Sequence, residues 1–421
     1  MKKAVIFLII LLLPASGEAY SQIQVNIKAR DRSTDDTITI RSLSRSHGLL
    51  TLQTAPDTDM EKTVRIPYTD LINYRLIPEN IESLWQIKIL ESDVYDNLLK
   101  NGYSFDQRYE MDEMMKEYLR KAEQDNSFYF DSYLEARLYG ILRKVYPVRH
   151  SDGRPGILSL RVLSDITPDT WIGPDGTLII TTGMISALND EDEMMALMAH
   201  EVAHFALDHH LANYKNSMAA GITPALGNLI RYTSEQEQAA DNCAVNVLNV
   251  CGKNPSLLGS MLRNVLAWGE LTGNYYLGTS RGLFPDAAAR AAALRGTLSV
   301  RSAEYDKLIA PVISFNAYRA YNQSQYLLCR WLIERNIAAK TATADEIVLL
   351  SQAMMHLSGS AEEDESALEV VRSVETGMAD PPRGAFRQEA LLLLKLGRRN
   401  EAEKALDRFG DALAREEQKY N

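Results

Sequence analysis

The chain has 421 residues, which is too long for one small domain and predicts two or three domains. Hydrophobic residues make up 46% of the chain and charged residues 24%, proportions that are ordinary for a soluble globular protein. The formal net charge is −11. Because a nucleic-acid-binding protein needs a basic surface that replaces counterions, this composition argues against a nucleic-acid partner.

The first 19 residues have the pattern of a secretory signal peptide. Two lysines precede the apolar run "AVIFLIILLLP", and Gly17 and Ala19 stand at suitable cleavage positions before Tyr20. The run is short for a membrane span, and an uncleaved N-terminal anchor is the alternative. We therefore expect residues 1–19 to be removed, the chain to be exported to the periplasm or cell envelope, and no integral membrane span to remain.

Residues 20–75 predict a small β-rich module, because short alternating segments such as "IQVNIKA" and "TITIRSL" are separated by turn residues. Helical spacing follows in "SYLEARLYGILRKVY". Two further strands, "ILSLRVLSD" and "TLIITTG", are predicted on either side of the turn residues "GPDG". A long helix is expected to start near Asn189 and to run into the cluster "HEVAHFALDHH", which spans His200 to His210.

Residues 306–421 predict helices throughout. The stretch "AFRQEALLLLKLGRRNEAEKALDRF" is similar to one helix–turn–helix unit of a tetratricopeptide repeat (TPR), with Leu396 and Gly397 at the turn. A weaker copy precedes it, and two units are fewer than the three that an independent solenoid usually needs. These TPR-like helices are interpreted either as an appendix packed on the main domain or as an array that binds envelope proteins.

His200, Glu201 and His204 form the motif HExxH. On a helix, positions i and i+4 lie about 40° apart, so both imidazoles point the same way, as catalytic zinc (Zn²⁺) requires. Glu201 lies about 100° round from His200, where it can reach a zinc-bound water rather than the metal. The alternative is a structural helix with surface histidines. The apolar residues on both sides of the motif indicate a buried helix. Burying paired ionisable groups costs free energy, which argues for a functional role of the motif.

One candidate for a third metal ligand is His210, which has the metzincin spacing HExxHxxGxxH. The glycine of that pattern is Leu207 here, and leucine resists the positive φ that such a turn often uses. If the helix continues past Leu207, neither His209 nor His210 reaches the metal, and both are expected to be surface or packing residues.

The other candidate is an acid in "SEQEQAADNCAVNVLNVCG", where Glu237 and Asp241 share one helical face at i, i+4. One carboxylate can then bind the metal while the other hydrogen-bonds a ligand histidine. The alternative is an ordinary capping box, with Ser234 as N-cap and Glu237 as its partner, followed by a solvated acid.

With these elements in order, the chain resembles the gluzincin metallopeptidases that include HtpX and the CAAX prenyl proteases (metallopeptidase family forty-eight), and within them the soluble exported, BepA-like branch. The resemblance covers about residues 130–300, and more loosely the C-terminal helices. It rests on the matching motifs "TTG" at 181–183, HExxH at 200–204, ExxAD at 237–241, and Pro285 with Arg290.

The resemblance implies an α+β fold, in which residues 76–305 form a mainly helical zincin metallopeptidase domain with a small sheet. It implies Glu237 as the third zinc ligand and Asp241 as the hydrogen-bond partner of a ligand. The family's "NAF" segment, which lines the substrate edge, is Asp169, Thr170 and Trp171 here, so the cleavage preference cannot be carried over.

The predicted reaction is zinc-dependent hydrolysis of polypeptides by an endopeptidase. Glu201 is expected to take a proton from water and pass it to the leaving amine. Arg290 is the candidate for oxyanion stabilisation, with Tyr275 or Tyr276 behind it, although Arg290 could equally hold structure. The strand "TLIITT" is expected to offer its edge to extended or misfolded segments of envelope proteins, which implies a role in protein quality control.

Two other functions stay open from the sequence. The protein could act mainly as a binding or assembly factor through its helical C-terminus, with little proteolysis. It could also be a metallo-aminopeptidase, because no group that recognises a substrate end is legible.

Overall fold

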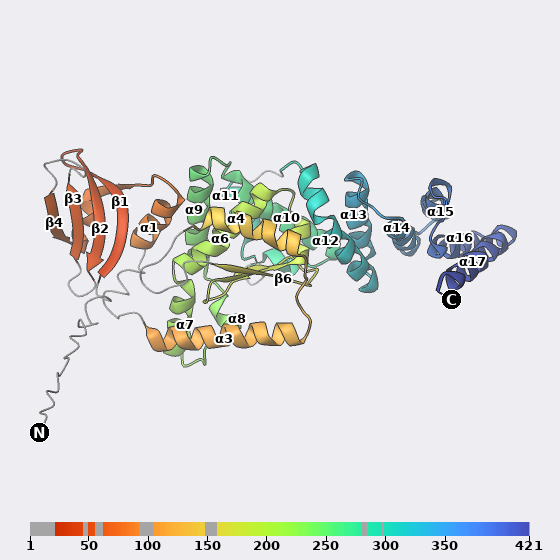
Figure 1. Cartoon of the computed structure of the whole chain (residues 1–421), viewed down its shortest axis with the longest axis horizontal. Helices are drawn as coiled ribbons and strands as arrows, with labels where there is room; N and C mark the ends of the chain where they lie inside the picture. The colour runs from red at the N-terminus through yellow and green to blue at the C-terminus, as the bar shows by residue number, and fades with distance from the viewer. Residues whose placement is uncertain are drawn as a thin grey trace, which may run out of the picture.

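A computed structural model describes residues 22–44, 49–54, 62–91, 104–147, 158–279, 284–295 and 299–420. The predicted signal peptide lies outside these residues. The protein is α+β and mainly helical, with a strand module at one end, a mixed central part, and a row of helices at the other end (Figure 1). None of the helices in the described segments has the length and apolar character that a membrane span requires.

The N-terminal module is an antiparallel sheet with strand order β4-β3-β2-β1-β5. Alternating residues such as Ile27, Ala29, Ile38 and Ile40 point inward and are buried, as the alternation predicts. The strands are β1 (Gln22–Asp31), β2 (Thr37–Ser44), β3 (Leu49–Thr54), β4 (Lys62–Pro67) and β5 (Tyr74–Ile77), with a 3₁₀ turn, η1 (Tyr68–Asn73), before β5.

Helix α1 (Ile81–Glu91) joins this module to the central part. Trp85 on α1 is fully buried, and its indole Nε1–H donates to the carbonyl of Val145 at 2.7 Å. Its ring also meets Tyr146 edge-on. Because Val145 ends α4 (Ser132–Val145), the module is packed against the central part through a shared apolar core.

A three-stranded sheet with order β6-β8-β7 lies at the centre. Strand β6 (Ser159–Leu163) runs parallel to β8 (Thr177–Thr181), and β7 (Thr170–Ile172) runs antiparallel to it. The prediction that "TLIITT" offers a free edge to substrate is therefore wrong, because β8 is paired on both sides. Residues 127–129 bond to the outer side of β6, so among the described residues the edge without a neighbouring strand is that of β7.

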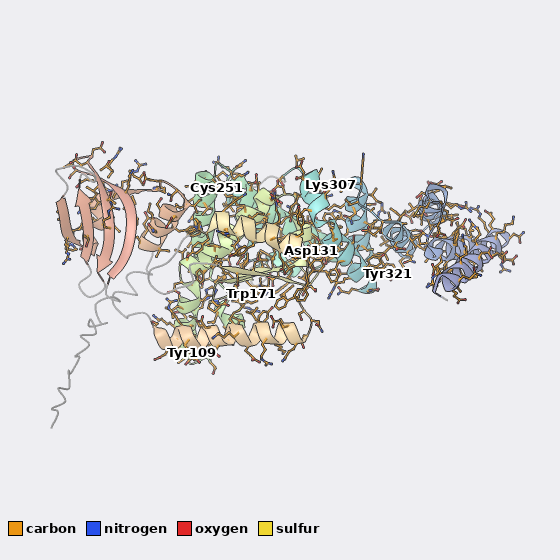
Figure 2. The ribbon with its side chains drawn as sticks, in the orientation of Figure 1. Tyr109, Asp131, Trp171, Cys251, Lys307 and Tyr321 are labelled. Carbon is orange, nitrogen blue, oxygen red and sulfur yellow. The ribbon has the colours of Figure 1, made fainter. Side chains whose placement is uncertain are left out.

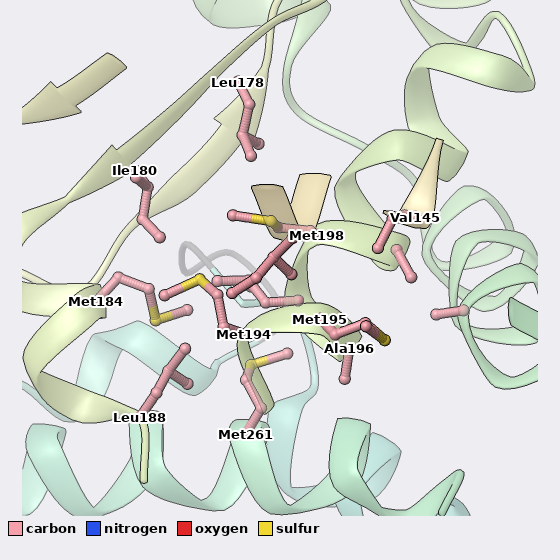
Figure 3. Packing of buried hydrophobic residues seen from close by; sticks show 14 of the residues in the cluster. Val145, Leu178, Ile180, Met184, Leu188, Met194, Met195, Ala196, Met198 and Met261 are labelled. Atoms are coloured by element: carbon pink, nitrogen blue, oxygen red, sulfur yellow. The ribbon is translucent and has the colours of Figure 1, made fainter. Parts of the chain in front are cut away.

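Side chains alternate across this sheet and bury against a helix on each face. Leu178 and Ile180 face α6 (Glu191–Ala206) and the main core, where five methionines fill the space between helices (Figure 3). On the other face, Trp171 and Ile179 pack against Met115 of α3 (Phe105–Gln124). Trp171 thus lies between the sheet and α3 (Figure 2).

The remaining helices of the central part surround α6. Helix α5 (Thr182–Ala187) follows β8 directly. After α6 come α7 (His209–Ala219), α8 (Leu226–Leu229), α9 (Ser234–Val250), α10 (Ser256–Thr272), the 3₁₀ turn η2 (Tyr275–Gly278) and α11 (Ala287–Ala293).

The C-terminal part consists of antiparallel helices, α12 (Ala303–Asn322), α13 (Tyr326–Ala338), α14 (Ala344–Leu357), α15 (Ala361–Gly377), α16 (Arg383–Lys395) and α17 (Arg399–Tyr420). The predicted turn at Leu396 and Gly397 separates α16 from α17, and Gly397 has φ +77°, which glycine adopts without strain. The boundary predicted between residues 305 and 306 falls inside α12.

Helices α12 and α13 belong to the core of the central part. Arg335 on α13 is 1% exposed and donates to the carbonyls of Ser186 and Leu188, while Asn316 on α12 donates to the Thr182 carbonyl. These contacts hold α5, which links β8 to α6. A deletion that begins near residue 310 would therefore damage the fold around α6.

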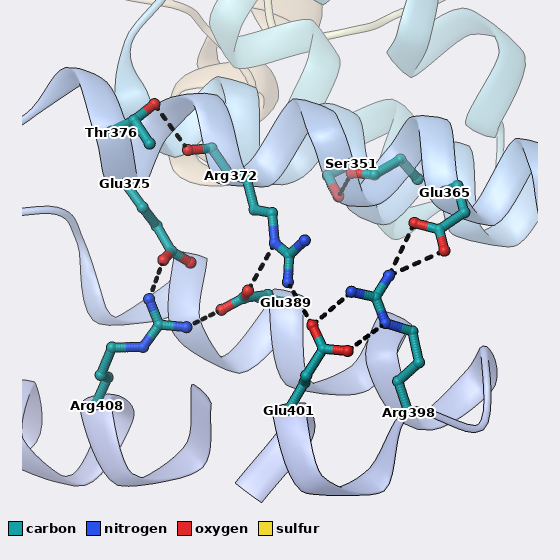
Figure 4. A network of polar contacts seen from close by, with 10 residues as sticks. Ser351, Glu365, Arg372, Glu375, Thr376, Glu389, Arg398, Glu401 and Arg408 are labelled. Carbon is teal, nitrogen blue, oxygen red and sulfur yellow. Dashed lines mark hydrogen bonds and ion pairs between the residues drawn. The ribbon is translucent and has the colours of Figure 1, made fainter. Parts of the chain in front are cut away.

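Helices α15 to α17 share a second apolar cluster with one side of α14. A network of alternating arginines and glutamates also bridges them (Figure 4), formed by Glu365, Arg372, Glu375, Glu389, Arg398, Glu401 and Arg408. The side chains of Glu375 and Glu389 are buried in this network, whereas the arginines are partly exposed.

Candidate metal centre

Helix α6 carries the HExxH residues in its last two turns. The helix begins after Asp190, whose carboxylate accepts a hydrogen bond from the backbone N–H of Glu193 at 2.7 Å. His200 and His204 point the same way, and their Nε2 atoms lie 3.2 Å apart. Both histidines and Glu201 are at most 5% exposed. The structural alternative with surface histidines is therefore wrong.

Helix α9 lies beside α6 and brings two acids to these histidines. Glu237 Oε2 lies 3.3 Å from His200 Nε2, and Asp241 Oδ1 lies 2.9 Å from His200 Nδ1. The expected capping box is shifted by one residue, because Thr233 caps α9 with Gln236 as its partner. The carboxylate of Glu237 is thus not used in capping.

His200, His204 and Glu237 offer three ligand atoms that all lie within 4.8 Å of one another. In a tetrahedral zinc site with metal–ligand distances of about 2.0–2.1 Å, neighbouring ligand atoms are separated by about 3.3 Å. The separations of 3.2 Å and 3.3 Å therefore fit a zinc ion bound by these residues.

Hydrogen bonds to the outer nitrogens set the tautomers that such a site needs. Asp241 Oδ1 lies 2.9 Å from Nδ1 of His200, and His209 Nδ1 lies 2.9 Å from Nδ1 of His204. With a proton on Nδ1 of each ligand histidine, both Nε2 lone pairs face the Glu237 carboxylate. Two lone pairs and a carboxylate that converge in this way favour binding of a cation between them.

Without a metal, protonation of His200 supplies the positive charge between these groups. Burial lowers the pKa of His200, but hydrogen bonds with Asp241 and Glu237 outweigh burial and raise it to about 10. Burial holds the pKa of His204 well below its ordinary value. Without metal, one proton on His200 thus stands between the carboxylates. Metal binding would release that proton.

Arg290 on α11 is bonded to both acids of α9. Its Nε and Nη2 donate to Asp241 at 2.8 Å and 2.7 Å, and Nη1 lies 2.7 Å from Glu237 Oε2. Nη1 also donates to the Pro285 carbonyl at 3.3 Å. Burial raises the pKa of the Asp241 carboxyl, but its bonds with His200 and Arg290 bring the value down to about 2. This geometry favours the structural alternative for Arg290 over oxyanion stabilisation.

The chain turns sharply after the motif. Helix α6 ends at Ala206, Asp208 adopts a left-handed φ of 60°, and α7 starts at His209. The helix therefore does not continue through Leu207, and the positive φ falls one residue later than in the metzincin pattern. Aspartate tolerates this conformation better than leucine does.

The two trailing histidines are buried, so of the two roles expected for them, surface or packing, the structure gives them the packing role. His209 contacts the ligand His204, as given above. His210 turns away from the ligand cluster, and its Nε2 lies 2.8 Å from the carbonyl of Ile172 and 3.0 Å from the hydroxyl of Tyr232. His210 is not part of the cluster that could hold a metal.

A cleft opens over the cluster and is lined by His200, Glu201, His204 and Glu237. The three residues predicted for the substrate edge, Asp169, Thr170 and Trp171, line one side of it. Tyr276 lines another side, whereas Tyr275 is 72% exposed and is not among the lining residues. Burial raises the pKa of the Glu201 carboxyl to about 8.

Residues 161–230 match the model of Peptidase family M48. The match supports the metallopeptidase family that the motifs resemble, and it implies polypeptide substrates. It spans the central sheet and α6 to α8, including His200, Glu201 and His204, whereas Glu237 on α9 lies beyond its end. No curated protein matches the chain.

Sequence reasoning missed two residues that hold the M48-like site together. Tyr232 stacks on the His204 ring with centroids 3.5 Å apart. Asn213 on α7 donates to the carbonyls of Leu229 and Arg231 at 3.0 Å and 2.9 Å and accepts from Gln236 at 3.0 Å. Nothing in the local pattern marks them, because their partners come from other elements.

Proposed function

We propose that the protein is a zinc-dependent endopeptidase that hydrolyses extended or misfolded segments of polypeptides. The observation that carries this proposal is the convergence of the ligand atoms of His200, His204 and Glu237 beside the buried Glu201 in an open cleft. Bound zinc would polarise water and the scissile carbonyl.

Glu201 is the residue that moves protons in this proposal. It lies one position after His200 on α6 and lines the cleft without belonging to the ligand set. It accepts a proton from the attacking water and later donates it to the leaving amine. Asp241 and His209 keep the ligand imidazoles in the required tautomer and orientation.

The edge of β7 is where we expect an extended substrate to bind. The backbone groups of Asp169 and Gly173 bond to β8, so by alternation those of Thr170 and Ile172 face the open edge. His210 contacts the Ile172 carbonyl, which leaves Thr170 nearest the cleft. Main-chain pairing with this edge reads little of the substrate's sequence, which suits a role in quality control.

The cellular setting is part of the proposal and is supported by the sequence. The N-terminal pattern indicates export to the periplasm or cell envelope, where misfolded envelope proteins would be the substrates. Within family M48 we propose the soluble exported, BepA-like branch, because a signal-peptide pattern precedes the metal-binding motifs and TPR-like helices follow them.

A binding or assembly function is the second candidate, and one surface favours it. Leu391 and Leu394 on α16 are 41% and 50% exposed, one helical turn apart. We expect Leu391→Asp with Leu394→Asp to weaken capture of unfolded protein while cleavage of short peptides stays unchanged. If capture is unaffected, this surface does not carry the second function.

Cleavage of casein by the Glu201→Gln variant tests the proposed reaction. The variant is expected to bind zinc as the wild type does and to lose cleavage. Glu403→Gln, a change at an exposed position on α17, is the matched control and should leave cleavage intact. For the ligand set, Glu237→Ala should lose zinc and His210→Ala should keep it.

A further inference from the structure

Arg231 lies in the wall of the cleft, in the segment between α8 and α9. Among the described residues that line the cleft, it is the one lysine or arginine. The other arginine at the site, Arg290, is already bonded to Asp241 and Glu237. No described residue forms an ion pair with Arg231, and its side chain is exposed to solvent.

A buried side chain holds the backbone of Arg231 in place. Its carbonyl accepts from the side-chain amide of Asn213 at 2.9 Å, and Asn213 is 7% exposed. The next residue, Tyr232, stacks on the ligand His204. The Cα atom of Arg231 is about 3.8 Å from that of Tyr232, so the Arg231 side chain begins close to the metal-binding cluster.

Apolar and aromatic side chains line part of the same cleft, beside the metal-binding residues and Asp169. Ile230 and Tyr232 flank Arg231, and Tyr276, Phe284 and Pro285 line other parts of the cleft. A substrate that fills this cleft displaces water, and an ion pair gains strength where water is excluded. A guanidinium also presents paired N–H donors that match a carboxylate.

We propose that Arg231 is a specificity-determining residue that binds a carboxylate of the substrate, so that the enzyme prefers peptides with Asp or Glu near the scissile bond. This inference rests on the proposed peptidase function and gives it a substrate class. Asp169 lies at the sheet edge and lines the same cleft, so in its ionised form it disfavours a substrate acid beside it. The preference is therefore confined to one substrate position.

Matched fluorogenic peptides test this. In each set, Glu, Gln or Lys occupies one of the three positions on either side of a fixed cleavage site. At one position, Glu is expected to raise kcat/KM about three- to tenfold over Gln, the range for a partly desolvated ion pair. The gain should shrink as salt is raised. Arg231→Gln should abolish it, and Arg231→Glu should shift the preference to Lys.

Arg399→Gln, at an exposed position on α17, is the control and should keep the wild-type preference. A wild type that cleaves all peptides of a set equally overturns the inference, as does a preference for Glu that survives in Arg231→Gln. In both results the peptidase proposal stands.

Binding of the same peptides to a Glu201→Gln background separates the two proposals. Fluorescence polarisation there reads the preference for Glu without turnover, and equal affinity for the Glu and Gln peptides overturns the inference. If the wild type cleaves no peptide at all, it is the proposed peptidase function that fails.

Discussion

Replacing Arg290 by glutamine distinguishes two roles of this arginine. Arg290 makes three short bonds to Asp241 and Glu237, and the three side chains are only 13%, 9% and 8% exposed. Removing one partner of a buried ion pair leaves uncompensated charge and costs about 3–5 kcal/mol. We therefore expect Arg290→Gln to lose about 3 kcal/mol of unfolding free energy when metal-free.

Zinc should restore much of this loss. In the zinc-loaded variant, Glu237 again faces a cation, so only the bonds to Asp241 stay broken. The stabilisation by zinc is therefore expected to be larger in Arg290→Gln than in the wild type. Arg290→Lys keeps the charge without the planar fork and should fall between the two.

Urea unfolding in a chelator and in excess zinc measures both effects. The matched control is Arg137→Gln, because Arg137 is exposed and its ion pair with the half-buried Glu191 is screened by solvent, so this variant should lose far less stability. An oxyanion-stabilising residue would behave differently, with unchanged stability and a loss of about 10²–10³ in kcat. That result would refute the positional role argued for Arg290.

Three further predictions follow from the site. Asn213→Ala leaves the carbonyls of Leu229 and Arg231 without their shared donor, which costs about 1–3 kcal/mol and should raise KM for peptides more than it lowers kcat; an unchanged KM contradicts this. Burial raises the pKa of Asp169 to about 7, so the folded state holds this proton more tightly than the unfolded state, and the associated stability is lost as pH rises from about 4 through 7. Asp169→Asn should therefore be more stable than the wild type at pH 8 but not at pH 4, and equal unfolding midpoints at pH 8 would count against it. His209→Ala removes the partner of His204 Nδ1 and should weaken zinc binding about 10- to 100-fold in a chelator competition, whereas His356→Ala, at an exposed position on α14, should not.

The motif on α6 could be interpreted from the sequence because its geometry is local. The spacing of His200 and His204 and the apolar flanks are enough to place both imidazoles on one buried face. The third ligand could not be assigned in the same way. From the residues alone, both Glu237 and His210 are candidates, and only the family resemblance favours Glu237. The reason is that Glu237 reaches the histidines only once α9 packs against α6, a contact between segments distant in sequence.

Other features depend on contacts that periodicity does not encode. The strand "TLIITT" could be predicted from its run of apolar residues, but its central position follows from pairing with β6 and β7 together. The break after α6 does not follow from the metzincin pattern, because the residue in the left-handed conformation is Asp208 and not Leu207 at the glycine position. The burial of Arg335 likewise depends on carbonyls at the end of α5, far away in sequence.

Zinc analysis of the wild type and Glu201→Gln, together with casein cleavage by the same preparations, tests the central claim most directly. The structure predicts about one zinc per chain in both proteins, since Glu201 is not a ligand, and cleavage by the wild type alone. Cleavage that persists in Glu201→Gln, or a wild type that binds no zinc, would contradict the account.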